Sequence, residues 1–299
     1  MKKFFLTALA VFSVASYAAS RSNPEPESST YEPGFEFLPP GTSFMPLVAS
    51  YQEPHTGLRK EIGSSRMKLE IGTTLDLLAY QFEGSEISDI RVGADLFAYG
   101  LTTSSQGLRL QIDAVDGLFG GHLVFRHGGG RSLFAIRLRI LHHSAHFVDG
   151  HYDLNSESWK GDRVPNPYTR DFGELVLAHR WILKQVSLRL YGGVSYATLA
   201  RPEEVQRWAG QAGIEFQYEV PGDGVWEKPF SIYLADHFSL NGVPAYRGSN
   251  NLEGGIKFGR WDGTGLRFYL NYHSGLEPFG QYFDLFREHW GVGFALDVF

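Results

Sequence analysis

The residue types best suited to chemistry lie together near the end of one alternating stretch, Leu133 to Asp149. Within it, His142, Ser144 and His146 occupy every second position. In a β-strand, positions i, i+2 and i+4 share one face. A hydrolase that forms an acyl-enzyme needs a serine within reach of a histidine base, and a third group that orients the histidine. The pattern therefore predicts His142 as a general base and Ser144 as a nucleophile.

The face that carries these groups is apolar along most of its length. The residues ahead of the histidine on this face are Phe134, Ile136, Leu138 and Ile140. The opposite face carries Arg137, Arg139 and His143. A serine and a histidine at the end of an apolar strand face could meet the acyl esters of a membrane without extracting them.

Two other interpretations of the same residues remain open. The polar side chains could anchor the strand at a membrane interface without doing chemistry. Alternatively, His142, His143 and His146 could bind a metal together with His151. A metal site needs converging ligands, whereas His143 lies on the opposite strand face from the other two.

The sequence does not identify the group that would orient His142. Candidates for this role, or for a calcium site, are the polar residues of the segment that follows: Asp149, Asp153, Asn155 and Glu157. Glu174 is expected to point to the opposite, inward face and is a poor candidate.

Alternation of the same kind recurs from residue 66 to the C-terminus. The twelve expected strands lie at about 66–77, 90–99, 108–114, 118–127, 133–149, 171–183, 186–199, 207–220, 229–240, 250–261, 264–275 and 287–299. Strands of about ten residues can cross a bilayer at a tilt, whereas ordinary strands average about five or six residues. The pattern predicts an all-β protein, an antiparallel transmembrane β-barrel of about twelve strands. A soluble, exported β-sandwich is a more distant alternative.

The expected connections place short turns and long loops at opposite ends of this barrel. Short turns are expected at 127–131, 184–185 and 261–265, and long outer loops at 144–170, 241–250 and 275–287. In this arrangement His142 and Ser144 face lipid at the outer end of their strand. The inward face carries both signs of charge in similar number, which predicts a cross-linked polar network inside the barrel.

The N-terminal residues are typical of a cleavable export signal. Lys2 and Lys3 precede an apolar run at 4–14, which is too short to span a bilayer, and small residues favour cleavage after Ala18. The expected divisions are a signal peptide (1–18), a disordered leader (19–36), an irregular N-terminal segment (37–65) and the barrel (66–299). Phe44 and Leu47 belong to an apolar group in the irregular segment that could plug the barrel or pack against its end.

Composition narrows the possible partners. The chain of 299 residues has no cysteine, so an exported form cannot depend on disulfides. Its net charge of −6 includes no basic run, which argues against nucleic acid as a partner. The final strand alternates from Trp290 to Val298 and ends on Phe299, which resembles the signal read by the outer-membrane barrel assembly machinery. Phe299 is in phase with Asp297 rather than with the apolar row.

Several stretches resemble the uncharacterised domain-of-unknown-function family 1207 (DUF1207). They are Leu38-Pro39-Pro40-Gly41 with Pro46-Leu47-Val48-Ala49, Arg137 to His146, Tyr191-Gly192-Gly193 with Trp208 and Gln211 to Glu215, and Tyr272-His273-Ser274-Gly275 with Pro278 to Tyr282. This resemblance implies a bacterial, exported, β-rich protein and no established activity. Family members often have Gly-Asp-Glu after the histidines, where this chain has Val148-Asp149-Gly150.

A weaker resemblance concerns the site. His142-His143-Ser144 is similar to the His-x-Ser of outer-membrane phospholipase A and the lipid A deacylases, which are barrels with these side chains outward. The resemblance implies a lipid acyl hydrolase and, if the chain is phospholipase-like, calcium. The first hypothesis is therefore a bacterial outer-membrane barrel, in contact with outer-membrane lipid, that hydrolyses acyl esters of that lipid. The alternative is a non-enzymatic barrel: a narrow channel, a transporter or a structural surface protein.

Overall fold

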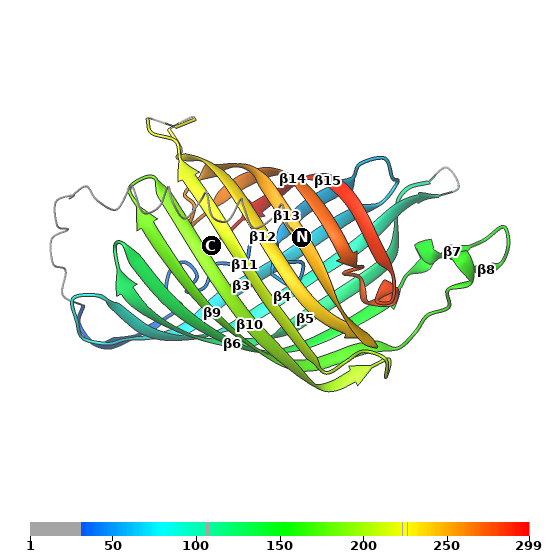
Figure 1. The fold of residues 1–299 in the computed structure, drawn as a ribbon, viewed down its shortest axis with the longest axis horizontal. Coiled ribbons are helices and arrows are strands. Elements are labelled where there is room, and N and C mark those ends of the chain that lie inside the picture. Colours follow the sequence, from blue (N-terminus) through cyan, green and yellow to red (C-terminus); the bar gives the residue numbers. More distant parts are fainter. Residues whose placement is uncertain (1–30, 106–107, 223, 226, 299) are drawn as a thin grey trace.

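The computed structural model describes residues 31–105, 108–222, 224–225 and 227–298. Within them the chain forms a closed antiparallel barrel of twelve tilted strands, seen from the side in Figure 1. The barrel strands are β2 (Thr56–Glu61), β3 (Met67–Gln81), β4 (Ile87–Ser105), β5 (Leu108–Gly129), β6 (Ser132–Phe147), β9 (Tyr168–Leu183), β10 (Val186–Arg201), β11 (Trp208–Glu219), β12 (Phe230–Val243), β13 (Ala245–Gly259), β14 (Gly265–Leu276) and β15 (Phe286–Asp297). The closed sheet confirms the barrel and excludes the sandwich.

The remaining elements are short. Three of them are strands: β1 (Gly34–Phe37), which pairs with the end of β3, and β7 (Tyr152–Asp153) and β8 (Ser158–Trp159), which pair with each other. Three are single 3₁₀ turns: η1 (Asp149–His151), η2 (Lys160–Asp162) and η3 (Gly280–Tyr282). In the described part of the chain, no helix is long and apolar enough to span a membrane.

The barrel closes through its shortest strand. β2 pairs with β15 on one side, where Glu61 lies opposite Gly291, and with β3 on the other, where Gly57 lies opposite Glu70. The other strands pair with their neighbours along the chain. This order brings the first and last barrel strands together and leaves no open edge in the wall.

The barrel has the expected number of strands, twelve, but the expected strands at 108–114 and 118–127 are wrong. β2 lies in the segment 37–65, which was expected to be irregular, so the barrel begins before residue 66. The two strands expected at 108–114 and 118–127 form one strand, β5. Leu101 pairs with Ala114 whereas Thr102 pairs with Ile112, so Asp113 is an extra residue. Such a bulge changes the phase of alternation, and a single strand then resembles two short ones.

Two further expectations need correction. The long loop expected at 241–250 is absent, because β12 and β13 continue to Val243 and Ala245 with only Pro244 between them. Residues 31–36, which were assigned to the disordered leader, are ordered: Tyr31 bridges to Gly84, and β1 adds to the edge of β3. The signal peptide (1–18) and Phe299 lie outside the described residues.

The two ends of the barrel differ. At one, which we call the turn end, short turns such as 130–131 and 184–185 join the strands. At the other, the loop end, the strands are joined by longer segments, including 148–167 and 277–285. Figure 1 shows the β7–β8 hairpin projecting beyond the wall at the loop end.

The wall has an apolar outside and a charged inside. Outward residues include Ile71, Leu96 and Ile140, which are 75%, 64% and 69% exposed. The lumen contains close pairs of buried charges: Arg139–Glu174 at 2.7 Å, Arg189–Glu215 at 2.6 Å and Lys257–Asp297 at 2.6 Å. These pairs confirm the predicted mixed-sign network. An apolar exterior around a polar interior reverses the usual order of a soluble protein and is typical of a membrane barrel.

Residues 38–55, which we call the lumen segment, run through the inside of the barrel between β1 and β2. The backbone N–H of Ser43 donates to Asp76 at 2.7 Å, and that of Val48 donates to Glu215 at 2.9 Å. Leu47 is fully buried. Because the segment satisfies its backbone groups through lumen side chains, it is a fixed part of the core.

Glu53 holds the far end of the lumen segment against the wall. Its carboxylate contacts the guanidinium groups of Arg137 and Arg139, with Arg137 Nη2 at 2.5 Å and Arg139 Nη2 at 3.2 Å. Burial by itself raises the pKa of Glu53, but the two guanidinium groups outweigh this effect and hold the pKa below its ordinary value.

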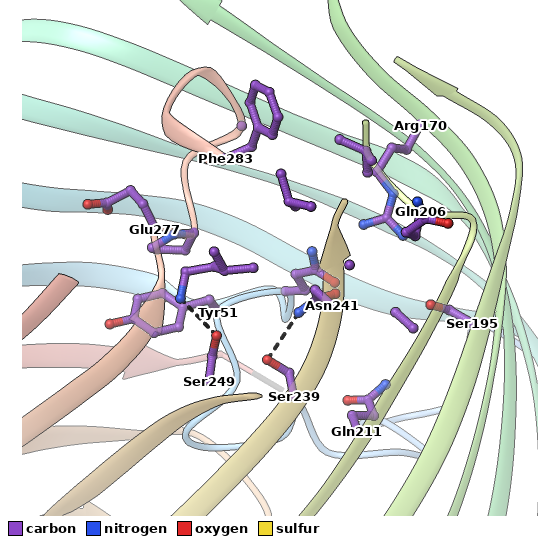
Figure 2. Close-up of a pocket in the computed structure, with 18 of the residues that line it drawn as sticks. Tyr51, Arg170, Ser195, Gln206, Gln211, Ser239, Asn241, Ser249, Glu277 and Phe283 are labelled. Atoms are coloured by element: carbon purple, nitrogen blue, oxygen red, sulfur yellow. Dashed lines mark hydrogen bonds between the residues drawn. The ribbon is translucent and has the colours of Figure 1, made fainter. Parts of the chain in front are cut away.

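The lumen segment divides the interior into two cavities. The larger, of about 1540 Å³, lies at the turn end and is lined by Phe44 and Met45. The smaller, of about 120 Å³, lies at the loop end and is lined by Tyr51 and Gln52 (Figure 2). The two cavities have no lining residue in common.

Candidate functional site

β6 places the predicted catalytic pair on the outside of the barrel. Its odd-numbered residues Leu141, His143 and Ala145 are each about 1% exposed and point inward. His142 and Ser144 alternate with them and are only partly covered, so they share the outward face. His142 and Ser144 therefore lie on the face and at the end of the barrel that the sequence predicted.

The structure gives His142 a carboxylate partner. Oδ1 of Asp171 lies 2.6 Å from Nδ1 of His142. The two residues are directly opposite each other on the neighbouring strands β6 and β9. A carboxylate at Nδ1 leaves Nε2 of the imidazole available for a second partner, as a histidine base requires.

The alternation of residues along β9 could have identified Asp171 as an outward residue. Residues of β9 alternate in burial, with Arg170, Phe172 and Glu174 inward. The same alternation that correctly excluded Glu174 places Asp171 outward. Its partnership with His142 depends on the register between β6 and β9, which cannot be read from either strand alone.

Aromatic packing fixes the histidine ring from its other side. Phe119 of β5 lies opposite His142, with ring centroids 5.0 Å apart and planes inclined at 40°. His142 is therefore held between a carboxylate on β9 and an aromatic ring on β5. Contacts on both sides restrict the rotation of the imidazole, so its orientation is defined before any substrate arrives.

Ser144 borders an open space on the wall. Its opposite residue on β5 is Gly117, and a Cβ added there would have no heavy atom within 4 Å. No hydrogen bond joins Ser144 to His142 in the described part of the structure, although their strand positions are adjacent on one face. Because Gly117 has no side chain, there is room on the outward surface beside the hydroxyl of Ser144.

A bulge in β10 lies next to Asp171. Ala197 pairs with Phe172 and Leu199 pairs with Asp171, so Thr198 is the extra residue. The hydroxyl of Thr198 donates to the backbone carbonyl of Asp171 at 3.1 Å. Bulges redirect nearby side chains and are common beside active sites.

Exposed aromatic residues mark the height of the site on the wall. Tyr196 and Trp208 are 40% and 57% exposed, and their rings are 4.8 Å apart. Tyr196 pairs with Gly173, two residues from Asp171. Tyrosine and tryptophan are enriched where a membrane meets water, and this pair lies on the same part of the wall as the site.

Two of the candidate orienting residues, Asp149 and Asp153, bond to backbone groups of the loop itself. Asp149 accepts a hydrogen bond from the backbone N–H of Gly150 at 2.9 Å. Asp153 accepts one from the backbone N–H of Asn155, also at 2.9 Å. The side chain that contacts Nδ1 of His142 is Asp171, on the wall and not in the loop.

The metal interpretation fails on geometry. His143 points inward and lies 2.7 Å from Asp116, and His151 points inward and lies 3.0 Å from Asp113. They are therefore on the opposite side of the wall from His142 and His146. Among the described residues, no group of three His, Asp or Glu side chains could hold a metal ion.

Comparisons with known proteins identify a family. The family described as "Protein of unknown function (DUF1207)" matches residues 36–297. No curated protein matches the chain. The β domain of the Bordetella autotransporter BrkA is similar at 12% identity and a TM-score of 0.43, over 81% of this chain and 98% of that one. OmpT of the Vibrio cholerae outer membrane is similar at 8% identity and a TM-score of 0.29, over 81% and 95%.

Proposed function

Because the chain belongs to the family described as "Protein of unknown function (DUF1207)", whose name states no activity, we propose a function from the site itself: the barrel hydrolyses acyl esters of membrane lipid at its outward face. Ser144 is the nucleophile, His142 is the base and Asp171 orients the base. The observation that carries this proposal is the 2.6 Å contact between Asp171 and Nδ1 of His142, beside an outward serine.

The reaction follows from these roles. Asp171 accepts a hydrogen bond from Nδ1–H of His142, which leaves Nε2 free to take the proton of the Ser144 hydroxyl. The serine oxygen attacks the ester carbonyl, and the lipid alcohol leaves with the proton from His142. A water molecule, deprotonated by His142, then attacks the acyl-serine, releases the fatty acid and restores the hydroxyl. The carboxylate stabilises the imidazolium formed in each half of the reaction.

The surroundings of the site suit a lipid substrate. The apolar outward rows, the exposed aromatic pair Tyr196–Trp208 and the open space at Gly117 support a lipid substrate for Ser144. In this proposal a cleavable signal peptide exports the chain, and the barrel assembly machinery inserts it into the bacterial outer membrane. Low polarity around the site strengthens the contact between His142 and Asp171.

The alternative of a narrow channel has less support. The lumen segment crosses the interior and is fixed by Glu53 and by backbone bonds to Asp76 and Glu215. A path for ions from one end to the other would have to displace it. A transporter or structural role does not require a carboxylate at Nδ1 of His142, whereas a histidine base does.

Assays of the purified full-length protein in detergent micelles test the proposal. We expect release of fatty acid from a diacyl phospholipid, or from lipid A, without added calcium and in the presence of a chelator. Absence of acyl release from both substrates by folded protein, whether or not calcium is added, would overturn it.

A further inference from the structure

The loop-end cavity is a partly open space of mixed polarity on the lumen side of the wall. Its floor is the lumen segment at Tyr51, and its walls include β9, β11 and β12 (Figure 2). Phe283, from the loop that follows η3, lies at its upper boundary. Its volume of about 120 Å³ exceeds the roughly 10–15 Å³ needed for one water. It can therefore take a small organic molecule.

Arg170 is the cation of this cavity. It is 5% exposed, and its Nε is buried without a hydrogen-bond partner. Among the described residues, no carboxylate oxygen lies within 4 Å of its guanidinium, which stacks over the Phe172 ring at 5.0 Å. A buried charge without a counter-charge is costly, and a bound anion would remove this cost.

The acidic residues on the cavity wall are already neutralised. Glu174 contacts Arg139 at 2.7 Å and Arg137 at 3.3 Å. Glu277 contacts Arg66 at 2.8 Å. Both carboxylates belong to balanced clusters of two guanidinium groups and two carboxylates: Arg137 and Arg139 with Glu53 and Glu174, and Arg66 and Arg287 with Glu61 and Glu277. Arg170 therefore gives the cavity an excess of positive charge.

The rest of the cavity offers neutral hydrogen-bonding groups. Hydroxyl and amide side chains that line it include Ser195, Gln206, Gln211, Ser239 and Asn241. Part of their capacity is used inside the protein: Asn241 donates to Ser239 at 3.2 Å, and Gln211 donates to Glu174 at 2.7 Å. Hydroxyls and amides both donate and accept hydrogen bonds, which suits a ligand rich in hydroxyl groups.

We propose that the loop-end cavity binds a small hydroxylated anion, of the size and class of a sugar acid or sugar phosphate. Arg170 holds the anionic group, and the hydroxyl and amide side chains of β10 to β12 hold the hydroxylated body. This site is separate from the outward site at Ser144, from which the barrel wall divides it.

Titration calorimetry on the full-length protein in detergent micelles tests the proposal. The probes are D-glucuronate and D-glucose 6-phosphate, with uncharged D-glucose as the matched control. We expect at least one anion to bind at least about tenfold more tightly than glucose, because a hydrogen bond to a charged group is worth more than a neutral one. The result also distinguishes a carboxylate ligand from a phosphate ligand.

Variants locate the binding. Arg170→Gln should weaken anion binding at least about tenfold, whereas Arg170→Lys, which keeps the charge, should retain part of it. Arg201→Gln is the control, since Arg201 is exposed and does not line the cavity. Should Arg170→Gln fail to fold, Ser195→Ala makes a smaller change in the same cavity and should weaken binding several-fold.

Three results would overturn the proposal. The first is that neither anion binds the folded wild-type protein. The second is that glucose binds as tightly as both anions. The third is that the folded cavity variants bind the anion with the affinity of the wild type.

Discussion

Nδ1 of His142 and Oδ1 of Asp171 lie 2.6 Å apart on the outward face of the barrel, on strands that pair these two residues directly. An isolated histidine on an apolar wall would need no such partner. The carboxylate fixes the tautomer of His142 with Nε2 free, on the side chain two positions from Ser144. This contact separates a candidate catalytic site from an ordinary polar residue at a membrane interface.

Asp171 should act through the histidine and not by contact with substrate. Asp171→Asn keeps the size of the side chain but removes the charge that stabilises the imidazolium. We expect kcat for ester hydrolysis to fall by roughly 10²–10⁴-fold, with KM nearly unchanged. Steady-state kinetics on a fluorogenic phospholipid in mixed micelles measures both parameters.

Glu288→Gln is the matched control for loss of one outward carboxylate. Glu288 is exposed on β15, where it accepts a hydrogen bond from Ser274 at 3.0 Å. Its replacement should leave kcat at the wild-type value. Equal activity of the Asp171→Asn and Glu288→Gln variants would remove Asp171 from the mechanism.

The neighbouring histidines of β6 should have opposite effects when replaced. His142→Ala should abolish hydrolysis and leave stability within about 0.5 kcal/mol, because its side chain is on the surface. His143→Ala should lower the free energy of unfolding by roughly 3–5 kcal/mol, because it leaves Asp116 buried without its 2.7 Å partner. Urea unfolding followed by heat-modifiable gel mobility, together with kcat of the folded fraction, separates the two effects.

The lumen segment should keep the barrel closed to ions. Wild-type protein in planar bilayers should show no steady conductance, whereas replacing residues 43–53 with a Gly-Ser linker of equal length should open an aqueous path. The same replacement at 153–157, outside the wall, should leave the barrel closed. Stable conductance of the wild type at low voltage would contradict this function of the segment.

Stability should fall in acid through Glu53. Its pKa is held below the ordinary value of about 4.5 in the folded state, so the unfolded state binds the proton first. The stabilisation is therefore complete above about pH 4.5 and is lost as the pH falls toward the lowered pKa. The stability difference between wild type and Glu53→Gln should shrink over this range in thermal unfolding. A difference that is constant with pH would show that Glu53 does not titrate in this way.

The architecture could be predicted because alternation is a local property of a strand. His142 and Ser144 were assigned correctly to the outward face, and Glu174 to the inward face, from period-two burial alone. β2 was not predicted, because its six residues are too few for a clear pattern. The continuity of β5 was not predicted for another reason: the bulge at Asp113 shifts the phase of alternation within the strand.

The partner of His142 could not be predicted because it depends on register. Asp171 lies 29 positions from His142, and only the pairing of β6 with β9 brings the two together. The candidates that the sequence offers, such as Asp149, lie in the loop that directly follows the strand. The same limit applies to the lumen segment, whose contacts with Asp76 and Glu215 join distant parts of the chain.

The most direct test of the central claim is the rate of acyl release by Ser144→Ala compared with wild type, measured on folded protein in the same phospholipid micelles. The substitution removes only the hydroxyl oxygen, and the outward position of Ser144 leaves the barrel and its heat-modifiable mobility unchanged. We predict a loss of about 10³-fold or more in kcat. Hydrolysis by Ser144→Ala at the wild-type rate would contradict the assignment of Ser144 as nucleophile.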